Sequence, residues 1–100
     1  MVMRREYEIN PIIVNGLSFK KLIIDPHVDK HSDHISDELI KVLIKYLDQE
    51  KHIPTGERGS YKYFASRIKH GERFYKLIWL LEENFLYLGV ITAFKDRRIK

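Results

Sequence analysis

The chain has 100 residues, of which 44% are hydrophobic and 32% charged, and it contains no cysteine. This length indicates one domain spanning residues 1–100, and the composition argues against a disordered chain. The lack of cysteine excludes disulfides and thiol chemistry and fits a reducing compartment. The longest apolar run, FLYLGVITAF, is too short to cross a bilayer as a helix. We therefore expect a cytoplasmic protein with no membrane partner.

Positive charge is concentrated in the second half of the chain. The net charge is +4; residues 1–56 hold eight Lys and Arg against nine Asp and Glu, whereas residues 57–100 hold ten against five. A basic segment with interleaved aromatic residues is typical of a protein that binds an anionic polymer such as RNA. The alternative is that the charge serves solubility alone. Three aromatic residues could stack on bases or belong to the core: Tyr61, Tyr63 and Phe64.

Two apolar, β-branched runs flank an Asn-Gly pair. The runs are Tyr7–Val14 and Leu17–Ile24, and Asn15-Gly16 between them is a strong signal for a two-residue hairpin turn, because both positions tolerate positive φ. Pro11 lies inside the first run and has no backbone N–H, which predicts an edge strand. This hairpin could extend the sheet formed by the rest of the chain or cover its other face.

A long amphipathic helix is predicted for residues 36–52. Ser36 is a suitable N-cap, and Asp37 and Glu38 complement the positive end of the helix dipole. Pro54 would stop the helix soon after its last turn. Apolar residues recur at helical spacing and form the expected buried stripe: Leu39, Ile40, Leu43, Ile44 and Leu47.

Three strand-like runs follow a polar connector, residues 53–59. They are Ser60–Ile68, Arg73–Leu81 and Phe85–Phe94. Their short connections predict antiparallel pairing. The last run is apolar at both its odd and its even positions, as expected of a central strand or of one with both faces covered. The predicted fold class is α+β: an N-terminal β-hairpin, one long α-helix and a three-stranded antiparallel β-meander packed against the helix.

The predicted turns determine which side chains share a sheet face. Turns at His70-Gly71 and Glu83-Asn84 would pair Tyr75 with Thr92. Lys76 would project to the opposite face, and a slip of one residue would move Thr92 there as well. In the predicted register, one face carries a cation together with hydroxyls and rings, a surface suited to RNA: Lys62, Ser66, Arg73, Tyr75, Trp79 and Thr92.

The order helix, polar loop and meander, with the segment FYKLIWLLEENFLYLGVITAFKDRR, resembles the RelE/ParE toxin group over residues 31–98. That group belongs to a wider class of metal-independent ribonucleases that includes barnase, EndoU and the colicin ribonucleases. The resemblance implies a RelE-like fold, RNA cleavage without a cofactor, and an antitoxin protein as partner. In RelE-like proteins a Tyr–Arg pair often opens the middle strand and a basic segment ends the last one. Tyr75-Lys76 and Lys95–Arg98 stand at these places, so lysine replaces the arginine.

Three histidines occur in the stretch DPHVDKHSDH, residues 25–34. Metal-independent RNA cleavage needs a base, an acid and cations for the phosphate. His31 and His34 lie beside the predicted helix N-terminus, where the dipole keeps a ring neutral, as a general base requires. The alternatives are a solvated loop whose Asp residues turn the chain, and a zinc or nickel site formed by His27, His31 and His34.

These patterns favour a metal-independent endoribonuclease of the RelE-like toxin type. The catalytic candidates are His31, His34, Lys62, Tyr75, Lys76 and Thr92. The candidates for RNA binding are basic residues of the second half: Arg58, Arg67, Lys69, Arg73, Lys95, Arg97 and Arg98. No cofactor is expected, the expected partners are RNA and an antitoxin protein, and a homodimer is left open. The alternative is a non-catalytic module, ParE-like or otherwise, that binds nucleic acid or protein.

Overall fold

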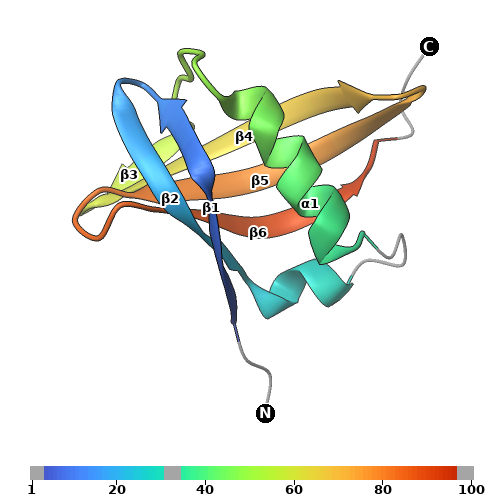
Figure 1. The fold of residues 1–100 in the computed structure, drawn as a ribbon, viewed down its shortest axis with the longest axis horizontal. Coiled ribbons are helices and arrows are strands. Elements are labelled where there is room, and N and C mark those ends of the chain that lie inside the picture. The colour runs from blue at the N-terminus through green and yellow to red at the C-terminus, as the bar shows by residue number, and fades with distance from the viewer. Residues whose placement is uncertain (1–3, 31–34, 97–100) are drawn as a thin grey trace.

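Six strands form one mixed sheet in the computed structural model, which describes residues 4–30 and 35–96 (Figure 1). The strands are β1 Arg5–Val14, β2 Leu17–Ile24, β3 Gly56–Arg58, β4 Tyr61–His70, β5 Arg73–Glu82 and β6 Tyr87–Lys95. Their order across the sheet is β1-β2-β6-β5-β4-β3. β2 pairs with β6 in parallel, and the other neighbouring strands pair antiparallel.

The β1–β2 hairpin turns at Asn15 and Gly16, as the sequence predicts. Both residues have positive φ, 51° and 85°, a conformation that Asn and Gly adopt most readily. β1 is an edge strand, also as predicted, and its register with β2 shifts between Glu8 and Ile12. The missing N–H of Pro11 therefore falls where the ladder is already interrupted.

β6 lies inside the sheet, between β2 and β5, which confirms the prediction of a central strand. Residues 21–24 of β2 pair with residues 87–90 of β6. The N-terminal hairpin therefore extends the sheet. Because a parallel pair needs a long crossover, the helix and the other three strands all lie between these two partners in the chain.

The helix is shorter than the predicted residues 36–52. α1 spans Asp37–Ile44, and one 3-10 turn, η2, continues it at Lys45–Leu47. Ser36 is the N-cap, as predicted, and its Oγ accepts the Leu39 N–H at 3.1 Å. Within residues 4–30 and 35–96, no helix has the length and apolar character needed to cross a membrane.

The helix ends because the residues after η2 bond to β1. The Ile13 N–H donates to Asp48 Oδ1 at 2.7 Å, and the Gln49 N–H donates to the Ile13 carbonyl at 2.6 Å. Gln49 has a φ of 62°, which is incompatible with a continuing right-handed helix. A tertiary contact thus overrides the helical periodicity of the sequence.

The predicted fold class, a long helix packed on a three-stranded meander in a RelE-like arrangement, is wrong. In its described part the chain is mostly a six-stranded mixed sheet with one short α-helix. Residues 56–58 of the predicted connector form the edge strand β3, which pairs with β4. All three residues of β3 are exposed, so it lacks the apolar alternation by which a strand is recognised in a sequence.

α1 crosses one face of the sheet, over β4, β5 and β6 (Figure 1). The core on this face includes Trp79, which is 0% exposed and stacks on Phe64 with ring centroids 4.2 Å apart. The Trp79 indole N–H donates to Ser66 Oγ at 2.9 Å, so its polar atom is satisfied inside the core. Further buried members come from α1 and three strands: Leu22, Ile40, Leu43, Leu77, Leu81 and Leu88.

The opposite face of the sheet, which we call the open face, carries no α-helix within the described residues (Figure 1). In β5 the residues of this face, from Phe74 to Leu80, are half-buried, whereas the alternating residues from Tyr75 to Leu81 are buried under α1. Each central strand therefore contributes one side to the core and the other to a surface.

A charged cluster joins the start of α1 to β1. Arg5 donates from Nε and from Nη2 to the two oxygens of Asp37, at 2.8 and 2.9 Å, and the Tyr7 hydroxyl donates to Asp37 Oδ2 at 2.5 Å. The hydrogen bonds from Arg5 are the largest cause that holds the pKa of Asp37 below its usual value. The hydrogen bond to Asp37 in turn raises the pKa of Tyr7.

The Asp37→Asn variant should lose about 2 kcal/mol of unfolding free energy at neutral pH, because it leaves Arg5 without its bidentate anion. A depressed folded pKa contributes stability that is complete above the unfolded value of about 3.9 and is lost as pH falls through the folded pKa. The difference between wild type and variant should therefore shrink in acid. Urea unfolding followed by circular dichroism, from neutral pH downward, measures it.

Glu38→Gln is the matched control. The Glu38 side chain is 84% exposed and its Lys41 partner lies at 3.4 Å on the same helix. Such an exposed pair contributes about 0.5 kcal/mol or less. Equal destabilisation by the two variants would contradict a specific role for Asp37.

Candidate functional site

The open face combines aromatic rings with basic side chains. Its rings and cations come from adjacent strands, so they lie side by side across the sheet. The open-face residues of β4, β5 and β6 are Tyr61, Tyr63, Ala65, Arg67, Lys69, Phe74, Lys76, Ile78, Leu80, Glu82, Tyr87, Gly89, Thr92 and Phe94. Most of them are exposed or half-buried, in contrast to the residues under α1.

Cations lie over rings at two places on the open face. The Arg67 guanidinium carbon is 4.4 Å from the Phe74 ring centroid, and Lys69 Nζ is 5.7 Å from the same centroid. Further along the sheet, Arg4 lies over the Tyr87 ring at 5.9 Å. These contacts keep the cationic groups near the sheet surface, beside the half-buried rings.

Tyr61 and Tyr63 stack on each other, with centroids 6.4 Å apart and an interplanar angle of 23°. Arg58 of β3 pairs with Tyr61 in the ladder and lies on the same face. Both tyrosines are half-buried. Of the three aromatic residues that the sequence could not assign, these two belong to the open face, and Phe64 belongs to the core.

The four predicted catalytic residues that the structure describes are divided between the two faces of the sheet. Tyr75 was expected to pair with Thr92, but Tyr75 pairs with Lys95, and Thr92 pairs with Ile78. Tyr75 is buried under α1, whereas Thr92 lies on the open face. The predicted shared face that joins Tyr75 to Thr92 is therefore wrong. The turn is longer than the predicted Glu83-Asn84, because Glu82 pairs with Tyr87, and this moves the pairing by two residues without changing faces. A β-bulge between β5 and β6 then adds one residue at Ile91 and exchanges the faces.

The register of β4 and β5 is also displaced from the prediction, but without changing faces. The turn is Gly71-Glu72, with His70 paired to Arg73, instead of His70-Gly71. A one-residue shift of a turn moves each pair by two residues, so every side chain stays on its predicted face of the sheet. Lys62 therefore stays on the same face as Tyr75, and both belong to the side that α1 covers.

Lys62 and Lys76 thus lie on opposite faces. Lys62 Nζ is 2.9 Å from a Glu83 carboxylate oxygen, and this hydrogen bond is the main cause that raises the pKa of Lys62. Lys76 pairs with Arg67 and Phe94 on the open face. Of the two lysines, Lys76 is the one placed beside the rings.

The predicted RNA-binding residues fall into three groups. Arg58, Arg67 and Lys69 lie on the open face, although Arg67 also forms an ion pair with the buried Asp96 at 3.3 Å. Arg73 is exposed at the β4–β5 turn, and Lys95 pairs with Tyr75 at the end of β6. Arg97 and Arg98 lie outside the described residues, as do the catalytic candidates His31 and His34.

The suggested metal site cannot be assembled from the described part of the chain. His27 lies in the 3-10 helix η1, Pro26–Lys30, and its backbone N–H donates to Asp25 Oδ1 at 2.8 Å. Within residues 4–30 and 35–96, no three His, Asp or Glu side chains are grouped so as to hold a metal ion. The other two suggested ligands, His31 and His34, fall in the segment that is not described.

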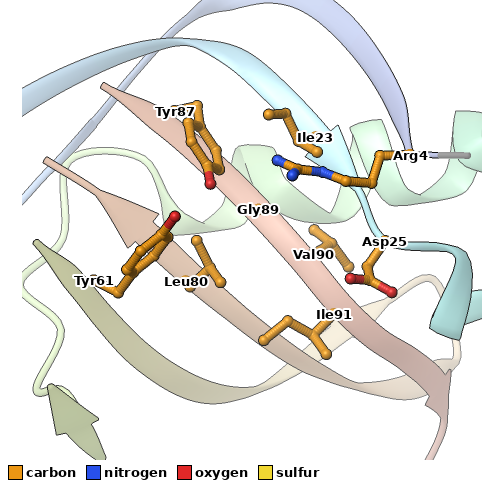
Figure 2. A pocket seen from close by; sticks show the side chains of 9 residues that line it. All are labelled: Arg4, Ile23, Asp25, Tyr61, Leu80, Tyr87, Gly89, Val90 and Ile91. Carbon is orange, nitrogen blue, oxygen red and sulfur yellow. The ribbon is translucent and has the colours of Figure 1, made fainter. Parts of the chain in front are cut away.

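A depression opens in the open face at Gly89 (Figure 2). Its volume is about 200 Å³, and its floor is formed by Gly89 with Leu80 of the adjacent strand. A Cβ atom at Gly89 would lie 3.0 Å from Leu80 Cδ1, so any side chain here would begin to fill the hollow. We call this depression the Gly89 pocket; it is lined by Arg4, Ile23, Asp25, Tyr61, Leu80, Tyr87, Gly89, Val90 and Ile91.

The hydroxyl groups of Tyr61 and Tyr87 point toward each other at one side of the Gly89 pocket (Figure 2). Burial, and then the hydrogen bond with Tyr61, raises the pKa of Tyr87 to about 12. The Tyr87 hydroxyl therefore stays protonated at neutral pH and remains a hydrogen-bond donor. The Arg4 side chain reaches toward Tyr87, and Asp25 lies at the side of the hollow away from Tyr61, so the rim carries donors and an acceptor around an apolar floor.

One local feature of the sequence indicates the Gly89 pocket, which the sequence analysis did not predict. Gly89 is an isolated glycine in an otherwise apolar strand, a pattern that marks a bulge or a close approach of another group. Arg4 and Asp25, by contrast, carry no local signal. They reach the pocket only because β2 pairs with β6.

Comparison with protein-family models, with curated proteins and with solved structures finds no match for this chain. The residues themselves must therefore carry any functional argument.

The Tyr61→Phe variant should lower the pKa of Tyr87 without returning it to the ordinary tyrosine value of 10.0, because it removes the hydrogen bond but leaves the larger cause, burial. Tyrosine-selective ¹³C labelling and NMR titration of the ring carbons measure the midpoint. Tyr63→Phe is the control, since Tyr63 is not among the groups that shift Tyr87. An unchanged midpoint in Tyr61→Phe would contradict the coupling between the two hydroxyls.

Proposed function

We propose that the open face binds single-stranded RNA. The observation that supports this proposal is the occurrence of half-buried rings beside cations on one sheet face that no α-helix covers within the described residues. Rings on a sheet stack on unpaired bases, and neighbouring cations attract the phosphates. The net charge of +4 acts in the same direction.

The rings and cations extend along β4. From Tyr61 to Lys69 the strand advances eight residues, or about 26 Å at roughly 3.3 Å per residue. Tyr61 and Tyr63 occupy one end, and Arg67, Lys69 and the ring of Phe74 occupy the other. An extended strand of a few nucleotides could therefore contact rings and cations in succession.

RNA cleavage stays a prediction of the sequence. Two of its six candidates, His31 and His34, lie outside the described residues, and the other four are divided between two faces, with Lys62 and Tyr75 on the side of α1. Binding needs only the open face, so it is the function better supported by the described geometry. Fragmentation of RNA in EDTA by wild type but not by His31→Ala would restore the catalytic hypothesis.

The double variant Lys69→Gln/Lys76→Gln should weaken binding of a single-stranded RNA of about 12 nucleotides and lower its salt dependence. Each lost phosphate contact reduces the slope of log K against log salt by about 0.7 for a single strand, so two contacts give a decrease of about 1.4. Fluorescence anisotropy across a salt series measures both affinity and slope.

Lys45→Gln/Lys51→Gln is the charge-matched control. Both lysines are exposed, and they belong to η2 and the segment that follows it, away from the open face. If the two double variants weaken binding equally, net charge alone explains the affinity and the open face is not the site.

Tyr63→Ala should weaken RNA binding by about 1–3 kcal/mol, the usual contribution of one base stacked on an aromatic ring. Tyr46→Ala is its control, because Tyr46 is 47% exposed and lies in η2, outside the open face. Anisotropy at one fixed salt concentration, with thermal melts to verify folding, makes the comparison. Unchanged affinity in folded Tyr63→Ala would remove stacking from the proposal.

A further inference from the structure

The Gly89 pocket adds a site of defined size to the open face. Its volume of about 200 Å³ exceeds the roughly 150 Å³ of a cavity known to admit benzene, and it is smaller than the roughly 300–1,000 Å³ of most ligand sites. One heterocyclic ring system is therefore the largest group that it suits. The pocket also lies beside Tyr61, which belongs to the surface proposed to bind RNA.

The polar groups of the pocket differ in what they can recognise. Arg4 carries only donors, and the carboxylate of Asp25 only acceptors. Asp25 Oδ1 accepts the His27 N–H at 2.8 Å, and the Asp25 N–H donates to the Val90 carbonyl at 2.9 Å, so the carboxylate is held at the pocket wall. Figure 2 shows the Arg4 guanidinium reaching toward Tyr87 and the Asp25 carboxylate beside Val90, and both residues line the pocket.

A base that fits this rim must present donors to a carboxylate and acceptors to a guanidinium. Guanine has two adjacent donors, N1–H and the N2 amino group, which match the two oxygens of a carboxylate. It also has two adjacent acceptors, O6 and N7, which match the fork of an arginine. Adenine and cytosine each offer one amino group, and uracil offers one N–H, so each leaves part of the rim unpaired.

We infer that the Gly89 pocket accepts one guanine base of the bound strand, with its N1 and N2 groups on Asp25 and its O6 and N7 atoms on Arg4. This inference rests on the proposed binding of RNA by the open face. The ring of the base lies on the floor formed by Gly89 and Leu80, and the paired hydroxyls of Tyr61 and Tyr87 close the wall opposite Asp25.

The test uses uracil-rich strands of about 12 nucleotides that differ at one central position, which is guanine, adenine, cytosine or uracil. The guanine strand should bind wild type about five- to 150-fold more tightly than the others, the discrimination usual for a bidentate contact to a base. Affinities are compared as ratios within each variant, so that changes in net charge cancel.

Asp25→Asn should abolish the guanine preference. Asparagine keeps an oxygen that can accept the His27 N–H, but it replaces one acceptor with a donor that faces the guanine donors. Asp48→Asn is the matched control, because Asp48 Oδ1 also accepts a backbone N–H, that of Ile13, at the far side of α1. This control should keep the wild-type ratio.

Gly89→Ala tests the pocket by its shape. The added Cβ would lie 3.0–3.1 Å from the flexible end of Leu80, which is half-buried on the open face and can shift toward the hollow. The fold should therefore persist in a thermal melt while the guanine ratio falls toward one. This variant also covers the case in which Asp25→Asn fails to fold.

The outcomes separate the two proposals. If no strand binds, the proposed function fails and the inference fails with it. If all four strands bind wild type equally, RNA binding stands and the guanine pocket is overturned. A preference for adenine, cytosine or uracil, or a guanine preference that survives in both folded Asp25→Asn and folded Gly89→Ala, also overturns it.

Discussion

The parallel pairing of β2 with β6 is the constraint on which the rest of the structure depends. Four residue pairs join the N-terminal hairpin to the meander, and the Asp25 N–H continues this ladder through the Val90 carbonyl. Without the pairing there would be two small sheets, each with an exposed edge. With it, Asp25 is placed beside a strand that lies more than sixty positions later in the chain, and one wall of the Gly89 pocket forms.

The two faces of the sheet serve different purposes. One short helix can cover only one face, and the apolar residues on that side form the core around Trp79. The other face keeps rings and aliphatic side chains half-exposed, next to cations that lie over them. Lys62 of β4 lies on the covered face, whereas Lys76 of the adjacent strand β5 lies on the open face.

Local irregularity in β6 turns part of a flat surface into a hollow. Gly89 removes a side chain from the open face, and the bulge at Ile91 changes the pairing two residues later. A bulge bends its strand and increases the local twist. The hollow therefore results from two departures from regular sheet geometry within three residues, at the place where β2, β5 and β6 meet.

The sequence by itself determined the local elements: the Asn15-Gly16 turn, the edge position of β1, the Ser36 cap and the central character of β6. These follow from backbone conformation, hydrogen-bonding capacity and apolar patterning, all of which act between near neighbours. It did not determine the end of the helix at Ile44, the strand β3, the bulge at Ile91 or the partner of the hairpin. Each of these depends on a contact between distant segments, such as Asp48 with Ile13, whose energy no local pattern records. The prediction that Lys62 and Tyr75 share a face is confirmed, because the β4–β5 turn is displaced by one residue and every pair therefore moves by two. The prediction that Thr92 shares this face is wrong, because the one extra residue of the bulge moves Thr92 to the other face.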